Sequence, residues 1–255
     1  MGRKMIESEV KLFNRPKMEK PLLIEGLPGI GYVGKLAAEH LIEEFEAEKF
    51  GEINSPFFPH HVSIDSGILS PAKNEFYLVE LEGKDVIILV GDVQATSSEG
   101  HYELANKVLD TAESFDVSRI FTLGGYATGQ YSKSQPKVFG VVNHPKLLEE
   151  YGSDGLVIRE GTGPIIGISG LLLGLGSLRS IRGVCLLGET HGMLVDHRSA
   201  RSVLEALSSM LDFKVDLSKL EEHAKKTESI LRRMRKVEKL RKRRKEREEE
   251  VSYIG

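Results

Sequence analysis

The sequence has few of the features that mark secreted or membrane proteins. Its 255 residues include a single cysteine, Cys185, which excludes an internal disulfide. No uninterrupted apolar run reaches the roughly 18 residues of a membrane-spanning helix, and no apolar segment follows the first residues as a secretory signal would require. We therefore expect a cytoplasmic protein without a membrane partner. Cys185 lies within an apolar run, and we expect it in the core.

Positive charge is scarce outside one segment. The chain carries 35 Lys and Arg against 38 Asp and Glu, which gives a formal net charge of −3. Residues 232–247 hold eleven of the basic residues and only two Glu, so the rest of the chain has 24 basic and 36 acidic residues, a balance of −12. The chain is therefore an acidic body that carries a basic C-terminal segment.

Aromatic side chains are missing from this basic segment. A high density of Lys and Arg can bind nucleic-acid phosphates. However, Phe213 precedes residues 232–247 and Tyr253 follows them, so no aromatic ring lies among the basic residues to stack on bases. Nucleic-acid binding through this segment is kept as an alternative function, and we do not expect nucleic acid to be the partner.

Short apolar runs alternate with helical segments across residues 20–212. Such runs are typical of strands that are buried on both faces of a parallel sheet. The runs are Leu22–Ile24, Val86–Val90, Ile120–Leu123 and Gly183–Leu187. A glycine between the apolar runs at 76–81 and 86–90 indicates a hairpin. The sequence therefore predicts a doubly wound α/β fold, with a mostly parallel sheet flanked by helices.

The composition changes near Lys214, where a long helical extension begins. We therefore divide the chain into an α/β core domain at residues 1–214 and a helical arm at residues 215–255. Apolar residues in the arm recur at spacings of four and three, as in a coiled coil. We interpret them as a seam that packs on a sister subunit or another partner. The seam residues are Leu220, Ala224, Leu231 and Met234.

A glycine-rich loop follows the first apolar run and satisfies two nucleotide-binding patterns. Its residues Gly29, Gly31, Gly34 and Lys35 match both G-x-G-x-x-G and G-x4-G-K, in which glycines let backbone N–H groups approach phosphate. Both patterns are incomplete. Leu36 stands where a P-loop has Ser or Thr, Pro28 removes one N–H, and Glu52 is the only acid placed to bind ribose. A nucleotide-binding enzyme, a packing turn and a partner-contact loop all stay open.

A second polar loop, Gly188–Gly192, follows the last buried run. His191, Asp196 and His197 could ligate a metal, or Glu189 and His191 could form an acid–base pair, but the spacing matches no strong ligand pattern. The alternative is that these side chains cap the helix that begins near Ser199. We expect capping, and we expect no metal, no cofactor and no catalytic residue.

Two longer segments carry a family resemblance when they occur together. Leu22–Lys35 and Leu186–Asp196, with Ser199–Leu207 after them, resemble the proteasome assembly chaperone family and its archaeal homologues. The resemblance covers residues 18–230. It implies a non-enzymatic scaffold or chaperone with a doubly wound α/β domain, which forms a homo-oligomer of four or five subunits. The implied partners are proteasome α-subunits or a related small protein.

The resemblance also implies a role for the last residues. Proteasome regulators dock through a C-terminal peptide in which a hydrophobic residue, a Tyr and one further residue follow each other. In this sequence Tyr253 is third from the end and Ser252 occupies the hydrophobic position, so the match departs from that pattern. We still predict that the partner is bound through the tail. The predicted partner-binding residues are Val251, Tyr253, Ile254 and Gly255.

Overall fold

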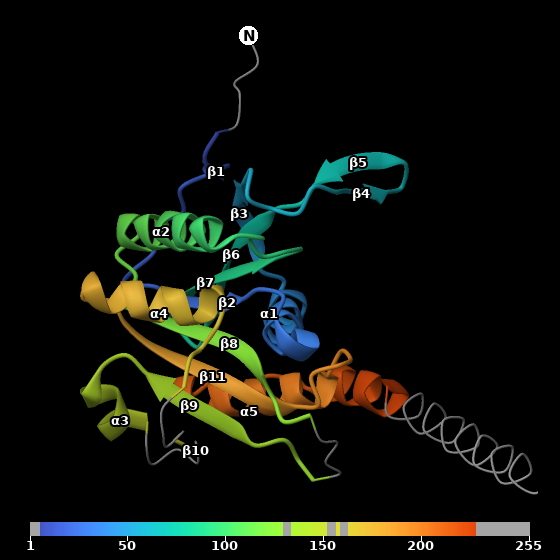
Figure 1. Ribbon diagram of the computed structural model, residues 1–255. Coiled ribbons are helices and arrows are strands. Elements are labelled where there is room, and N and C mark those ends of the chain that lie inside the picture. The colour runs from blue at the N-terminus through green and yellow to red at the C-terminus, as the bar shows by residue number, and fades with distance from the viewer. Residues whose placement is uncertain (1–5, 130–133, 152–156, 159–162, 228–255) are drawn as a thin grey trace, which may run out of the picture.

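The computed structural model describes residues 6–129, 134–151, 157–158 and 163–227. Within these residues, nine strands form one sheet in the order β1-β3-β6-β7-β2-β8-β11-β9-β10 (Figure 1). The strands are β1 (Glu9–Leu12), β2 (Leu22–Gly26), β3 (Glu48–Asn54), β6 (Asn74–Leu81), β7 (Lys84–Gly91), β8 (Arg119–Ala127), β9 (Val138–Val142), β10 (Val157–Ile158) and β11 (Arg182–Thr190).

The four central strands are parallel, as their continuous apolar runs predict. Strand β2 pairs with β7 and β8, and β8 pairs with β11, all in parallel register. The margins are antiparallel at β1–β3, β3–β6, β6–β7 and β9–β11. The predicted hairpin joins β6 to β7 through Glu82 and Gly83, whose φ angles of 48° and 76° suit a two-residue turn.

Helices cover both faces of the sheet, which confirms the doubly wound α/β prediction. Figure 1 shows α2 (Ser98–Ser114) and α4 (Ile168–Leu178) on one face, and α1 (Val33–Glu44) and α5 (His197–Leu211) on the other. A short helix, α3 (Pro145–Tyr151), lies beside β9. Each face has its own buried cluster. Ile24, Leu41, Phe121, Val184 and Leu204 belong to the α1–α5 cluster, and Leu23, Ile87, Leu104, Ile120 and Leu172 belong to the α2–α4 cluster.

A separate β-hairpin projects from the body and was not predicted from the sequence. It consists of β4 (Val62–Asp65) and β5 (Ile68–Pro71), which form a two-stranded sheet of their own (Figure 1). Ser66 and Gly67 make its turn with φ angles of 49° and 83°. The hairpin is inserted between the end of β3 and the start of β6.

The first part of the arm packs on the body of its own chain. Residues 218–227 are helical, and His40 Nε2 lies 2.7 Å from the carbonyl oxygen of Asp216, next to the start of this helix. Leu220 and Ala224 are only 5% and 7% exposed, and Leu220 belongs to the α1–α5 cluster. These two seam residues are therefore buried without a second subunit. Leu231 and Met234 lie outside the described residues, so their part of the seam stays a prediction.

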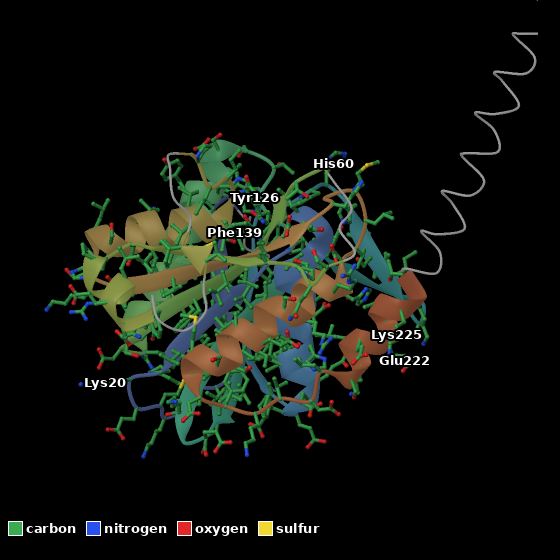
Figure 2. The ribbon with its side chains drawn as sticks, turned by 90° about the horizontal axis from the view of Figure 1, so that it is seen from below. Lys20, His60, Tyr126, Phe139, Glu222 and Lys225 are labelled. Atoms are coloured by element: carbon green, nitrogen blue, oxygen red, sulfur yellow. The ribbon has the colours of Figure 1, made fainter. Side chains whose placement is uncertain are left out.

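The outer side of this helical segment is charged. Lys225 Nζ lies 2.8 Å from Glu221 Oε1, and Lys226 Nζ lies 2.7 Å from Glu222 Oε1. Figure 2 shows Glu222 and Lys225 on the outside of the molecule. Surface pairs of this spacing contribute little to stability. These charged side chains face solvent, while the inner side of the helix is apolar and packs on the body.

Candidate functional site

The two sequence motifs meet at the carboxyl edge of the central strands. The glycine-rich loop follows β2, and residues 191–196 follow β11. Because both strands are parallel to β8 between them, their carboxyl ends lie at one edge of the sheet, where α/β proteins commonly bind ligands. The backbone N–H of Asp196 donates to the carbonyl oxygen of Gly31 at 2.9 Å. A Cβ on Gly192 would lie 3.5 Å from Ile30 Cγ2. The two loops therefore form one surface.

Two glycines of this segment allow α1 to pack closely on the sheet. A Cβ on Gly34 would lie 2.0 Å from the carbonyl oxygen of Leu123 in β8, and a Cβ on Gly26 would lie 2.4 Å from the carbonyl oxygen of Gly34. Gly31 has a φ of 64°, which favours glycine. A Cβ on Gly29 would meet no atom closer than 4.0 Å. The glycine pattern is therefore explained largely by helix–sheet packing.

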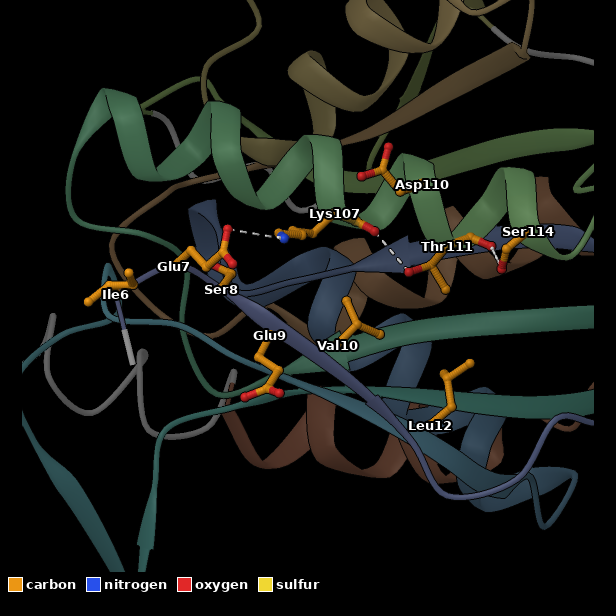
Figure 3. A pocket seen from close by; sticks show the side chains of 10 residues that line it. All are labelled: Ile6, Glu7, Ser8, Glu9, Val10, Leu12, Lys107, Asp110, Thr111 and Ser114. Carbon is orange, nitrogen blue, oxygen red and sulfur yellow. Dashed lines mark hydrogen bonds and ion pairs between the residues drawn. The ribbon is translucent and has the colours of Figure 1, made fainter. Parts of the chain in front are cut away.

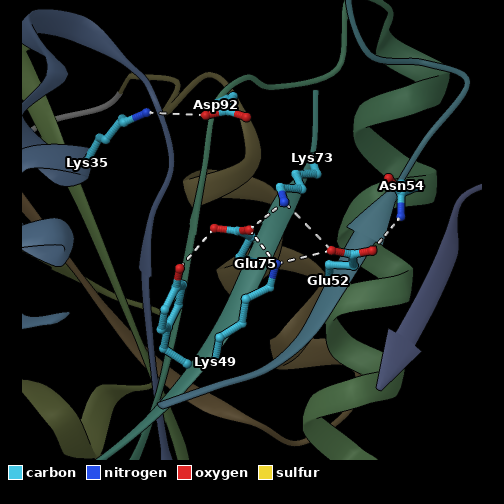
Figure 4. A network of polar contacts seen from close by, with 8 residues as sticks. Lys35, Lys49, Glu52, Asn54, Lys73, Glu75 and Asp92 are labelled. Carbon is cyan, nitrogen blue, oxygen red and sulfur yellow. Dashed lines mark hydrogen bonds and ion pairs between the residues drawn. The ribbon is translucent and has the colours of Figure 1, made fainter. Parts of the chain in front are cut away.

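Lys35 faces carboxylates at the start of α1. Its Nζ lies 3.4 Å from Glu39 Oε1 and 3.9 Å from Asp92 Oδ1, and Figure 4 shows the contact with Asp92. Glu52, which would have to bind ribose, lies on β3 and is separated from β2 by β6 and β7. The geometry thus favours a packing turn over a nucleotide site for this loop.

We therefore expect ATP, GTP and NAD to leave the melting temperature of the protein unchanged. A nucleotide present at 100 times its Kd, and bound only by the folded protein, would add about 2.7 kcal/mol of stability, which a thermal-shift assay detects easily. A rise in melting temperature that Lys35→Ala abolishes would contradict the packing interpretation and restore the nucleotide hypothesis.

The second loop is organised by Asp196, which caps α5 as predicted. Its Oδ1 accepts a hydrogen bond from the backbone N–H of Ser199 at 3.0 Å, and its Oδ2 accepts one from Thr190 Oγ1 at 2.7 Å. The helix begins at His197, two residues earlier than expected. The His197 ring packs on His223 at 5.2 Å, and burial together with that neighbour lowers its pKa.

The predicted metal alternative gains no support from this arrangement. Within the part of the chain that the structure describes, no three His, Cys, Asp or Glu side chains are grouped as metal ligands. Glu189 Oε2 instead accepts a hydrogen bond from the backbone N–H of Lys137, at a distance of 3.4 Å. The polar groups of this loop thus hold local structure together.

Large apolar side chains lie exposed on the surface that the two loops form. We call this surface the carboxyl-edge patch. Its exposed fractions are 48% for Ile30, 47% for Tyr32, 79% for Met193, 42% for Leu194 and 40% for Val195. Contiguous exposed apolar groups of this kind mark contacts with proteins or membranes. The patch is therefore suited to binding another protein surface.

A buried carboxyl group lies beneath the glycine-rich loop, on the α4 side of the sheet. Glu25 Oε1 accepts from the backbone N–H of Leu27 at 2.9 Å, and its Oε2 accepts from Ser169 Oγ at 2.8 Å. Burial raises its pKa to about 7, although the two hydrogen bonds oppose the rise. Cys185 is fully buried, as predicted, and burial raises the pKa of its thiol to about 12. Both groups are closed off from solvent.

Comparison with known protein families identifies the family of this chain. The family model described as PAC2 family matches residues 23–235. The chain belongs to the PAC2 family. An uncharacterized protein of Methanocaldococcus jannaschii is 36% identical over 219 residues, which cover 86% of this chain and 84% of the relative.

Solved structures similar to this PAC2 chain confirm the family resemblance and the fold. Pyrococcus furiosus PbaB, an archaeal proteasome activator, is 42% identical with a TM-score of 0.86, over 90% of this chain and 99% of that one. Pyrococcus furiosus PbaA, an archaeal homolog of proteasome-assembly chaperone, is 30% identical with a TM-score of 0.74, over 89% of this chain and 96% of that one.

Charged side chains of β3 and β6, together with Lys73 just before β6, form a network away from the patch in this PAC2 body. Lys49 Nζ lies 2.5 Å from Glu75 Oε1 and 3.1 Å from Glu52 Oε2, and Lys73 Nζ lies 3.0 Å from Glu75 Oε1 (Figure 4). Burial raises the pKa of Glu75, but hydrogen bonds from Lys49 and Lys73 outweigh it and hold the pKa below its ordinary value. Each charge has an opposite partner, so the network supports the antiparallel margin of the sheet.

A groove of about 680 Å³ lies at the edge of the PAC2 sheet, between β1 and α2 (Figure 3). Ser8 donates its backbone N–H to Glu103 Oε1 at 2.6 Å, and Lys107 Nζ lies 3.7 Å from Glu7 Oε2. The lining residues include neither histidine nor cysteine. Strands β3, β6 and β7 lie between β1 and β2, so the groove is separate from the carboxyl-edge patch.

The predicted tail contacts of this PAC2 chain lie outside the described residues. They comprise Val251, Tyr253, Ile254 and Gly255. Sequence reasoning kept a partner contact open for the glycine-rich loop, but it missed the second loop's part of the carboxyl-edge patch. The signal was available, because Met193-Leu194-Val195 is an apolar run inside a polar loop that follows a buried strand. Among the described residues, no helix combines the length and apolarity needed to cross a membrane.

Proposed function

We propose that this PAC2 chain is a non-enzymatic, homo-oligomeric scaffold of the cytoplasm that binds proteasome α-subunits. The observation that carries the proposal is its 42% identity to PbaB, an archaeal proteasome activator, over 99% of the PbaB chain. The similarity to PbaA, an archaeal homolog of proteasome-assembly chaperone, also supports this proposal. Four or five subunits form the oligomer in this proposal.

The chemistry of the carboxyl edge supports binding rather than catalysis. The charged groups of the two loops are engaged by neighbouring groups: Lys35 faces Asp92, and Asp196 caps α5. The exposed groups are apolar, led by Met193 and Tyr32. An apolar patch on a rigid sheet edge suits recognition of a protein surface.

The tail provides a second contact in this proposal. Val251, Tyr253, Ile254 and Gly255 reach the α-subunits from the arms of the oligomer. Each tail contact is weak, but several arms on one oligomer raise the effective concentration of the remaining tails once the first has bound. Nucleic-acid binding through residues 232–247 remains the alternative function of the arm, and those residues lie outside the described part of the chain.

Deleting residues 248–255 is expected to weaken capture of α-subunits at least tenfold. The reason is that every arm loses its contact at once, so the multivalent gain, about a hundredfold or more, disappears. The measurement is a pull-down of α-subunits from the same organism at graded concentrations. Tyr253→Ala is expected to reproduce most of the loss, whereas Ser252→Ala, one residue away, serves as the matched control.

The outcomes separate the two parts of the proposal. Equal capture by the intact and shortened proteins would overturn the role of the tail and leave the partner in place. Absence of capture by either protein would overturn the partner. Unchanged oligomeric mass and melting temperature of the shortened protein establish that the deletion acts on the contact alone.

A further inference from the structure

A histidine lies beside the apolar contacts that hold the arm on the body. In the helical residues 218–227, positions 220, 223, 224 and 227 have the spacing of one helix side. Leu220 and Ala224 are buried on that side, whereas His223 is exposed beside them and Thr227 is half-buried. An ionisable ring therefore borders a contact that is otherwise uncharged.

His223 faces a second histidine, His197, at the start of α5. The centroids of the two rings lie 5.2 Å apart, at an interplanar angle of 60°. Thr227 Oγ1 lies 3.4 Å from Nδ1 of His197. The half-buried His197 ring thus contacts two arm residues that are one helical turn apart. The histidine pair therefore spans the junction between the arm and the body.

The charged groups around this pair come from α5, the arm helix and α1. Asp196, just before α5, favours a protonated His197, and Glu222 interacts with the charge of His223. The other charged groups pair with one another: Lys219 with Glu43 of α1, Lys226 with Glu222, and Arg201 of α5 with Glu221. Carboxylates stay largely ionised at about pH 5, whereas an ordinary histidine becomes protonated. Acidification to this pH therefore changes mainly the histidines.

The remaining contacts of the arm do not depend on the charge of these two rings. His40 Nε2 lies 2.7 Å from the carbonyl oxygen of Asp216. A carbonyl oxygen only accepts hydrogen bonds, so this nitrogen carries a proton whether His40 is neutral or charged. Leu220 and Ala224 are apolar. Acid therefore acts on the junction through His197 and His223.

The direction of the effect follows from His197. Burial, and next the neighbouring His223, lower the pKa of His197 below its ordinary value of 6.5. Releasing the arm removes His223 and the burial that the arm supplies, so the released state binds a proton more readily than the docked state. Docking is therefore strongest above about pH 6.5, and it weakens as the pH falls through this value towards the lowered pKa.

We propose that the His197–His223 pair makes the attachment of the arm to the body sensitive to pH, and that protonation of both rings loosens residues 218–227 from α5. The two states are a docked and a released arm base, and the charge of the pair biases the equilibrium between them. The proposal goes beyond the proposed function, because it concerns the base of the arm and holds whichever partner the tail binds.

The first test is hydrogen exchange of the full-length protein at about pH 7.5 and about pH 5, with rates corrected for the intrinsic effect of pH. Protection of residues 218–227 is expected to fall in acid, roughly tenfold for each unit by which docking lowers the His197 pKa. His223→Gln, which keeps an uncharged helix-forming side chain, is expected to lose most of this response. Equal responses of the wild type and His223→Gln would overturn the proposal.

Two controls separate the arm from the rest of the molecule. His61→Gln changes an exposed histidine outside the junction and is expected to respond to pH as the wild type does. Helix α1 is the internal reference, and it is expected to keep its protection in acid, since protonation of Glu25 favours the folded body. A loss of protection in α1 that matches the loss in residues 218–227 would mean unfolding of the body, and it would contradict release of the arm.

The second test measures the His197 pKa directly, by NMR of ring-labelled histidines in the full-length protein. Leu220→Asn replaces a buried anchor of the arm with an uncharged polar group, and loss of protection at residues 218–227 alone establishes that it releases the arm. The His197 pKa is expected to rise towards 6.5 in this variant, because the coupling between docking and protonation is reciprocal. An unchanged His197 pKa in the released protein would overturn the proposal. Neither test uses α-subunits, so this inference and the proposed function can fail separately.

Discussion

Gly34→Ala is expected to destabilise the protein by about 3 kcal/mol, whereas Gly29→Ala changes its stability by less than about 1 kcal/mol. A Cβ on Gly34 would lie 2.0 Å from the Leu123 carbonyl oxygen and 2.7 Å from its carbon, and both are backbone atoms that no rotamer change can move. Helix α1 must therefore shift away from β8. At an ordinary helical position the same substitution stabilises by about 1 kcal/mol, so the sign itself is diagnostic.

Urea unfolding of the two variants and the wild type measures this difference. Gly29 is the matched control because it belongs to the same fingerprint, has an extended backbone, and would place its Cβ no closer than 4.0 Å to another atom. A Gly34→Ala protein as stable as the wild type would show that helix–sheet packing does not explain the glycine pattern.

The second large effect is a pH dependence that originates at Glu25. Burial raises the pKa of this carboxyl group from 4.5 to about 7 in the folded protein, against the opposing hydrogen bonds from Leu27 and Ser169. The folded state therefore binds a proton more readily than the unfolded state. The free energy of unfolding consequently falls as pH rises from about 4.5 to about 7, by about 3 kcal/mol at 1.36 kcal/mol per pKa unit.

Glu25→Gln is expected to remove this part of the pH dependence. The glutamine can still accept from the Leu27 N–H and can donate to Ser169 Oγ, but it carries no titrating group. Relative to the wild type, the variant therefore gains about 3 kcal/mol of stability between pH 4.5 and pH 8. Ser169→Ala removes a hydroxyl group that lowers the Glu25 pKa in the folded protein. The fall in the free energy of unfolding therefore continues to a higher pH in this variant. Parallel wild-type and Glu25→Gln curves of unfolding free energy against pH would contradict this account.

The centre of the fold could be predicted because burial on both faces leaves a strong mark on the sequence. Runs such as Val86–Val90 and Ile120–Leu123 are continuous and apolar, and both are central parallel strands in the structure. The hairpin turn at Glu82 and Gly83 carried its own local signal. The short β4–β5 hairpin was missed although it carries a signal of the same kind, because Val62-Ser63-Ile64-Asp65 alternates apolar and polar residues and the turn Ser66-Gly67 follows.

The candidate site could be predicted only in part. The sequence placed each loop after a strand. That the two loops form one surface depends on the tertiary contact between Gly31 and Asp196, which the sequence does not reveal. The role of Gly34 depends on a backbone distance that no fingerprint contains. The spacing of Leu220 and Ala224 is the same whether the apolar side packs on another chain or on its own body. In the structure it packs on its own body.

Native mass spectrometry of the full-length protein, alone and mixed with α-subunits, tests the central claim most directly. The claim is that this PAC2 chain is an oligomeric scaffold for proteasome subunits. The protein alone is expected to have the mass of four or five chains, and the mixture is expected to show an additional complex that contains both proteins. A single-chain mass for the protein alone, together with no mixed complex, would contradict the account.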